Sequence, residues 1–141
     1  MTRPVAWPVL KTYDADHLDR IALPLGGIGT GTVSLGGRGQ LQDWELMSRP
    51  AKGFSPKNTF FALYARPAGG PAVTRALEAP IPVSGYEGAS GATTPNHGLP
   101  RFARGVFKAA YPFGQVLLSD PDVPVSVRLQ AFNPIVPCDA A

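Results

Sequence analysis

Two glycine clusters flank a short β-branched and apolar run in the stretch Pro24-Leu-Gly-Gly-Ile-Gly-Thr-Gly-Thr-Val-Ser-Leu-Gly-Gly-Arg-Gly39, and Leu41-Gln-Asp-Trp-Glu-Leu46 follows it closely. Ordered glycine costs backbone entropy, so it is kept where φ must be positive or another backbone approaches closely. The clusters therefore predict a segment of defined shape. The second cluster, 36–39, supplies turn residues between a strand over 28–34 and a return strand over 40–47, which predicts a β-hairpin.

The rest of the chain has the composition of short strands joined by turns. Its 141 residues include 16 glycines and 16 prolines, about twice the usual share, yet 44% of the residues are hydrophobic, too many for a disordered chain. Val125, Val127, Leu129 and Ala131 alternate with polar residues, as in a half-buried antiparallel strand. No segment has a sustained helical period, so the sequence predicts an all-β, antiparallel β-sandwich. Its further strands are expected over 59–66, 73–79, 105–111, 115–119 and 123–132.

Charge and cysteine content exclude several classes of partner. The net charge is +3, and the basic residues form no run of the kind that binds nucleic acid. Cys138 is the only cysteine, which fits a reducing compartment. The N-terminus lacks the apolar core of a signal peptide, and no stretch has the length of a transmembrane segment. We therefore expect a cytoplasmic protein with no nucleic-acid partner.

The sequence contains no motif for a phosphate-binding loop, a metal site or a catalytic serine. The glycine run matches neither G-x-x-x-x-G-K-[ST] nor G-x-G-x-x-G, so turn formation is the better interpretation of it. His17 and His97 have no second ligand at metal-binding spacing. No serine lies in a G-x-S-x-G elbow. We expect no metal and no cofactor.

Asp43 and Glu45 are the one carboxylate pair of interest. Two residues apart on a strand, they are expected on the same face, and paired carboxylates carry out glycoside hydrolysis. A solvated strand face, or pairing with Arg38 or Arg49, is the more common role of such residues. Trp44 between them fits a core position better than a sugar-stacking platform.

A second group of charged residues lies further along the chain. Arg101, Arg104 and Lys108 form a modest basic stretch, which we expect on a solvated strand face. Contact with an acidic partner surface is the alternative.

Eight stretches, in the same order, resemble the N-terminal region of glycoside hydrolase family 116, the family of the non-lysosomal glucosylceramidase (β-glucosidase 2). They are Pro24-Leu-Gly-Gly-Ile-Gly-Thr-Gly31, Gly36-Gly-Arg-Gly39, Asp43-Trp-Glu-Leu46, Arg49-Pro-Ala-Lys-Gly53, Phe60-Phe-Ala-Leu-Tyr64, Gly98-Leu-Pro-Arg-Phe102, Ala110-Tyr-Pro-Phe-Gly-Gln-Val116 and Ala131-Phe-Asn-Pro134.

The resemblance implies a lead segment over 1–20 and an incomplete β-sandwich over 21–141. In the family, a helical (α/α)6 barrel carries a glutamate nucleophile and an aspartate acid/base, and it hydrolyses a β-glucoside or glucosylceramide with retention. This chain is then a fragment that holds no catalytic residue, and the barrel of the same protein is its partner. Candidates for the substrate mouth or the domain interface are Gly26, Gly27, Gly29, Thr30, Gly31, Asp43, Trp44, Glu45 and Arg49.

Two other functions stay open at this point. The chain could be a free-standing sandwich that binds carbohydrate on an exposed strip of Trp44, Tyr64 and Tyr86. It could also be an inactive remnant of the enzyme.

Overall fold

The computed structural model describes residues 10–27, 29–47, 49–86 and 94–134. Within these residues it contains strands and two short 3-10 helices, and no α-helix. The strands are β1 (Lys11–Tyr13), β2 (Ala22–Leu25), β3 (Gly31–Gly36), β4 (Leu41–Leu46), β5 (Ala62–Ala65), β6 (Val73–Ala76), β7 (Arg104–Ala110), β8 (Phe113–Ser119) and β9 (Val127–Phe132). The 3-10 helices are η1 (Ala15–His17) and η2 (Val83–Tyr86).

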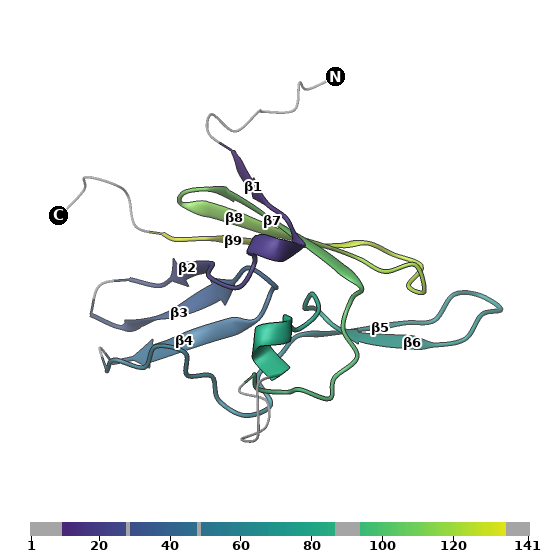
Figure 1. The fold of residues 1–141 in the computed structure, drawn as a ribbon, viewed down its shortest axis with the longest axis horizontal. Coiled ribbons are helices and arrows are strands. Elements are labelled where there is room, and N and C mark those ends of the chain that lie inside the picture. The colour runs from purple at the N-terminus through teal and green to yellow at the C-terminus, as the bar shows by residue number, and fades with distance from the viewer. Residues whose placement is uncertain (1–9, 28, 48, 87–93, 135–141) are drawn as a thin grey trace.

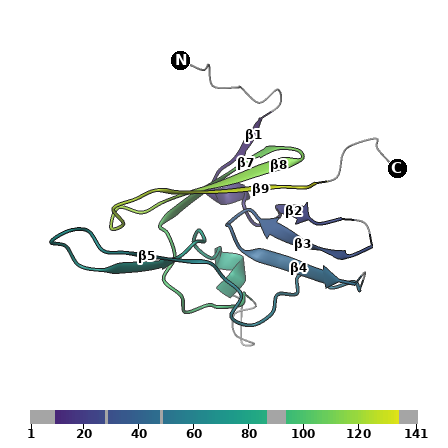
Figure 2. The same ribbon diagram turned by 180° about the vertical axis from the view of Figure 1, so that it is seen from behind.

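Two antiparallel sheets face each other across the core. One has the strand order β1-β7-β8-β9, and the other has the order β2-β3-β4. Figures 1 and 2 show the first sheet above the second from both sides. The predicted all-β sandwich is therefore confirmed.

Apolar side chains from both sheets form the core between them. Phe107, Val116 and Leu118 come from the larger sheet and are fully buried, while Leu23 and Leu35 come from the smaller one. Each such buried side chain stabilises the fold by about 1.5–3 kcal/mol. The sheets touch closely at Gly114 of β8, where a Cβ would lie 2.7 Å from Cδ2 of Leu23.

The strands with a clear local signal are found where the sequence predicts them. The β3–β4 hairpin is confirmed, and its turn closes through a hydrogen bond from the Gly36 amide to the Gln40 carbonyl at 2.8 Å. In β9, Val127, Leu129 and Ala131 pack against the core while the intervening residues are exposed; Val125, predicted on the same face, precedes the strand and is 46% exposed. Alternation along a strand is thus a reliable guide in this chain.

The sequence does not predict β1 and β2. β1 has three residues and pairs with β7, and β2 contains Pro24, which cannot donate to a ladder. Both are too short to show a period. The segment after β1 nevertheless enters the core, because Leu18 is 3% exposed.

The β5–β6 hairpin forms a third sheet and extends away from the other two (Figure 1). Two backbone contacts join its base to the body: a parallel bridge between Ala76 and Arg101, and a hydrogen bond of 2.7 Å from the Ala79 amide to the Arg38 carbonyl. This arrangement brings the residues after β6 beside the segment that leads into β7.

Candidate functional site

The loop between β2 and β3 is built on close backbone packing at two glycines. Gly26 has φ +145°, and a Cβ there would lie 2.7 Å from the Gly31 carbonyl oxygen. Gly31 has φ +91°, and its Cβ would collide with the carbonyl oxygen of Glu45 on β4. Both positions require glycine for the domain's own fold.

Gly27 and Gly29 differ from these two because their Cβ positions are open. Apart from its chain neighbours, a Cβ at either residue would meet no atom of the described residues within 4 Å, and of the two only Gly29 has a positive φ, +85°. A shallow hollow of about 310 Å³ lies at this loop. It is lined by Gly27, Gly29, Gly31, Thr32, Glu45, Arg49 and Pro50. The structure therefore brings five of the nine candidate residues to one place.

Thr30 and Trp44 have roles in the framework of this region. The Thr30 carbonyl accepts a hydrogen bond of 3.2 Å from the Met47 amide. Trp44 is half-buried, and its backbone amide donates to the Phe54 carbonyl at 3.1 Å. Its indole nitrogen is buried and donates to no acceptor in the described part of the chain. Neither side chain lines the hollow.

Asp43 lies at a β-bulge that interrupts the predicted alternation of β4. Gln42 pairs with Ser34 and Glu45 pairs with Thr32, so two residues of β4 face Val33 alone. Asp43 takes φ +53° there, a left-handed conformation that Asp tolerates better than most residues. Its buried carboxylate accepts a hydrogen bond of 2.7 Å from the Gly53 amide.

Glu45 binds the same loop as Asp43. Its carboxylate accepts hydrogen bonds from the Ala51 amide at 3.1 Å and from Lys52 Nζ at 2.9 Å. These two bonds, the one from Lys52 foremost, hold the pKa of Glu45 below its usual value, and the carboxylate in turn raises the pKa of Lys52.

The suggestion from sequence that these two carboxylates pair with Arg38 or Arg49 is wrong. The carboxylates bind Lys52 and backbone amides, because the loop after β4 folds back along the strand.

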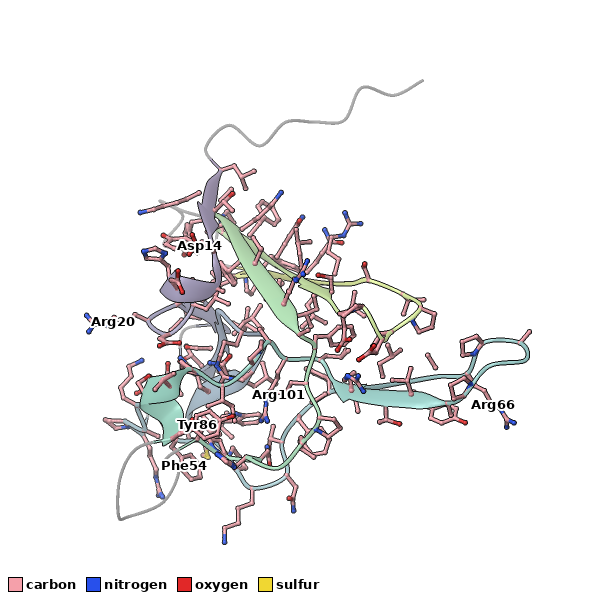
Figure 3. The ribbon with its side chains drawn as sticks, turned by 45° about the vertical axis from the view of Figure 1, so that its right-hand side comes forward. Asp14, Arg20, Phe54, Arg66, Tyr86 and Arg101 are labelled. Atoms are coloured by element: carbon pink, nitrogen blue, oxygen red, sulfur yellow. The ribbon has the colours of Figure 1, made fainter. Side chains whose placement is uncertain are left out.

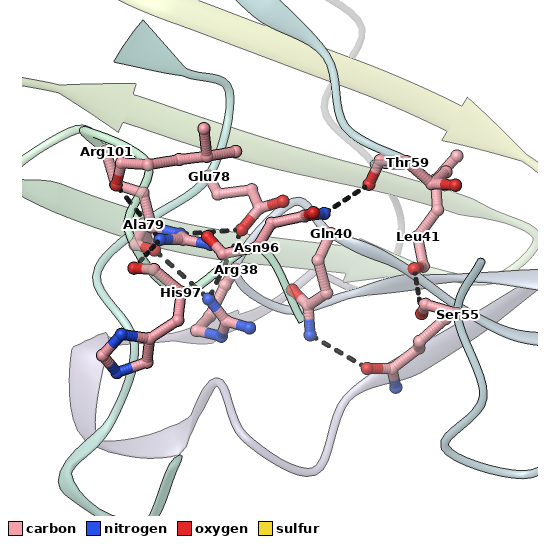
Figure 4. Close-up of polar contacts among 12 residues, drawn as sticks. Arg38, Gln40, Leu41, Ser55, Thr59, Glu78, Ala79, Asn96, His97 and Arg101 are labelled. Carbon is pink, nitrogen blue, oxygen red and sulfur yellow. Dashed lines mark hydrogen bonds and ion pairs between the residues drawn. The ribbon is translucent and has the colours of Figure 1, made fainter. Parts of the chain in front are cut away.

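Arg101 anchors the turn that precedes it and is not on a solvated strand face, contrary to the sequence prediction. Its side chain is 6% exposed and donates through Nε to Glu78 Oε2 at 2.9 Å. Its other nitrogens donate to the carbonyls of Asn96, His97 and Leu99 at 2.8–3.2 Å. The residue lies on the segment that leads into β7 (Figure 3), and its side chain turns toward Glu78 rather than outward (Figure 4).

Arg38, in the β3–β4 turn, approaches the same carboxylate from the other side. Its side chain is 7% exposed, and Nη1 lies 3.7 Å from Glu78 Oε2 and 3.4 Å from the Ala79 carbonyl oxygen. Burial lowers the pKa of the Arg38 guanidinium, and the charge of Glu78 opposes this effect.

One sequence signal could have found this cluster. Glu78 is a single charge in the apolar stretch 76–81, and a buried acid is normally paired.

A polar cavity of about 260 Å³ lies beside Arg38. Its lining residues include Asp19, Arg38, Gln42, Ser55, Thr59, Glu78, Gly85 and Asn96. Gln40 also lines it; the Gln40 amide nitrogen donates to Gln42 at 2.9 Å, while its buried oxygen accepts nothing within the described residues. The cavity and the hollow at the glycine loop adjoin opposite ends of β4.

A scan against protein families identifies the chain. Residues 22–141 match the model of the N-terminal region of glycosyl-hydrolase family 116, described as beta-glucosidase 2. This chain belongs to family 116. The expected family is thereby confirmed, and the matched range includes the glycine loop, the carboxylates of β4 and the lining residues of the polar cavity other than Asp19. A search of curated proteins found no match.

The three aromatic residues considered as sugar platforms lie on different elements of the family 116 domain. Trp44 is half-buried on β4, while Tyr64 on β5 and Tyr86 on η2 are 65% and 53% exposed. The hairpin that carries Tyr64 extends away from η2 (Figure 1). Of these three, Tyr86 is the one that directly follows a lining residue of the polar cavity, Gly85.

Two further searches concern the described residues of the domain. No group of three or more His, Cys, Asp or Glu residues there is placed to hold a metal ion. The described part of the chain also contains no helix with the length and apolar character needed to cross a membrane.

Proposed function

We propose that this domain braces the catalytic (α/α)6 barrel of a family 116 enzyme, and that the glycine loop 26–31 shapes the mouth of its active site. The observation that carries the proposal is the contrast within the loop. Gly26 and Gly31 are required by the domain's own packing, whereas Gly27 has open space at its Cβ position and an ordinary φ. A glycine that the domain itself does not need fits a surface that something else approaches closely.

The chemistry of the hollow suits a sugar substrate. Backbone N–H groups of the loop can donate to hydroxyl groups, and the Glu45 carboxylate at the edge can accept from them. In the full enzyme we expect hydrolysis of a β-glucoside or glucosylceramide with retention, by carboxylates of the barrel. Asp43 and Glu45 are not proposed as catalysts, because both are committed to the loop 51–53. The single cysteine supports a cytoplasmic location for this enzyme.

The test compares two glycines in a full-length family 116 enzyme, at the positions that match Gly27 and Gly31. Gly27→Val should lower kcat/KM for 4-nitrophenyl β-D-glucoside and leave the thermal midpoint unchanged, because the new side chain enters only the mouth. Gly31→Ala should lower the thermal midpoint, because its Cβ collides with β4. Gly29→Val is less informative, since φ +85° strains any side chain there.

Either of two results would contradict the proposal. Unchanged kinetics for Gly27→Val would place the loop away from the substrate. A full-length enzyme that keeps its thermal midpoint after removal of the matched region would exclude the bracing role.

A further inference from the structure

Arg38 is a buried guanidinium with few hydrogen-bond partners. It carries five N–H donors, and buried polar groups are normally paired. In the described part of the chain, its side chain makes one hydrogen bond, of 3.4 Å, and one ion pair, of 3.7 Å. Arg101 is equally buried and makes four hydrogen bonds of 3.2 Å or less. Arg38 therefore has donors to spare, and it lines a cavity.

The remainder of the cavity wall offers neutral hydrogen-bonding groups. Hydroxyls come from Ser55 and Thr59, and amides come from Gln42 and Asn96. These four residues belong to three segments of the chain, held together by bonds such as Asn96 Nδ2 to the Thr59 carbonyl at 3.2 Å (Figure 4). A volume of about 260 Å³ is slightly below the range of roughly 300–1,000 Å³ for drug-sized ligands. The occupant is then a small polar molecule.

The charges around the cavity favour a neutral occupant over an anion. Glu78 and Asp19 line the cavity together with Arg38, and Arg101 lies behind Glu78. Two cations thus face two carboxylates, and an incoming phosphate or carboxylate would meet like charges as it approached Arg38. A hydroxyl group accepts from a guanidinium without that repulsion.

An exposed aromatic residue directly follows one of the lining residues. Tyr86 follows the lining residue Gly85 in η2, is 53% exposed, and packs edge-on against His97 with ring centroids 4.6 Å apart. An aromatic face of this kind binds the C–H face of a sugar ring. Together with the polar lining, this ring therefore complements a molecule that is apolar on one face and rich in hydroxyls at its edge.

We propose that the cavity between the β3–β4 turn and η2 binds a neutral monosaccharide ring, with hydroxyls on Arg38 and the ring face on Tyr86. The glycine loop takes no part in this site, and the two adjoin opposite ends of β4. Failure of either proposal therefore leaves the other standing.

The experiment is an amide chemical-shift titration of the 141-residue chain with D-glucose. Saturable shifts are expected at residues 38–42, 53–59 and 94–96. Arg38→Met should weaken binding at least tenfold, as loss of hydrogen bonds from a charged group does. Tyr86→Ala should weaken it by a smaller factor. Arg75→Met is the matched control, because Arg75 pairs with Asp120 outside the cavity and its loss should leave binding unchanged.

Thr59→Leu gives a second route that keeps Arg38 in place and fills the cavity with an apolar side chain. It should abolish the shifts even if Arg38→Met disturbs the fold. The proposal is overturned if the wild-type chain shows no saturable shift, if Thr59→Leu binds D-glucose normally, or if inorganic phosphate binds the same residues more tightly than D-glucose.

Discussion

Two loops of this domain are anchored to the framework by charged side chains of opposite sign, and the groups that these side chains hold differ in exposure. Arg101 is buried and donates to the buried Glu78 and to three carbonyls of the turn 96–99. Asp43 is buried too, but it and Glu45 accept from amides of the exposed loop 51–53, where Lys52 is 74% exposed.

The comparison shows that the exposure of the anchored groups, rather than burial of the charged side chain itself, governs the cost of losing the anchor. Water can hydrogen-bond to an amide of the exposed loop 51–53 that has lost its partner, so the loss of stability is smaller there. It cannot do so at Glu78, which is buried and keeps its full desolvation penalty when unpaired. Variants of the two anchors should therefore differ widely in stability.

The largest expected effect is that of Arg101→Met. The substitution leaves Glu78 and three carbonyls without their donor, and breaking a buried pair from one side costs about 3–5 kcal/mol. Urea denaturation of the purified chain measures the loss. If Arg101→Met lowers the free energy of unfolding by less than Asp43→Ala does, the expected order of the two anchors is wrong.

Asp43→Ala should have the next largest effect, about 2 kcal/mol. It removes the acceptor of the Gly53 amide and places alanine at φ +53°. Asp43→Asn is the control, since asparagine tolerates this φ and keeps a side-chain acceptor. Equal losses for both variants in urea denaturation would show that the negative charge, rather than the bulge geometry, is what matters.

Arg38→Met should cost only about 1 kcal/mol, although Arg38 is as buried as Arg101. It loses one long hydrogen bond and one long ion pair, and Glu78 keeps its bond to Arg101. Urea denaturation of the purified Arg38→Met chain measures this loss of stability. A loss as large as that of Arg101→Met would mean that Arg38 is a structural anchor too, and would argue against its spare donors.

The smallest effect concerns the pH dependence of the loop 51–53. Because Lys52 and the Ala51 amide lower the pKa of Glu45, the unfolded chain binds this proton at a higher pH than the folded chain does. The stabilisation is complete above the unfolded value near 4.5 and is lost as pH falls through the lowered folded value.

The measurement for this prediction is a pH titration of the Ala51 amide shift. Lys52→Met should move the midpoint up toward the ordinary value for glutamate. An unchanged midpoint would show that the Ala51 amide alone sets the pKa of Glu45.

The sequence predicts part of the candidate site and not the rest. Gly27, Glu45 and Arg49 are candidates from sequence, and the structure brings them to one hollow. Lys52 was missed as the partner of Glu45, because the fold of a short loop decides which cation reaches a carboxylate.

Features that depend on near neighbours along the chain could be predicted from the amino-acid sequence. Alternation in β9 and the glycine turn at 36–39 are local, and each is readable because a strand has a period of two and a tight turn needs glycine. The family could also be recognised from the sequence, because short motifs occur along the chain in the family's order.

The pairing of Arg38, Glu78 and Arg101, and with it the polar cavity, arises from the tertiary fold. These residues lie on segments that are far apart along the chain, and no local period connects them. Which charge meets which is set by how the base of the β5–β6 hairpin and the start of β7 lie against the β3–β4 turn. The physical reason is that an ion pair depends on distance in space, whereas a sequence pattern records only distance along the chain.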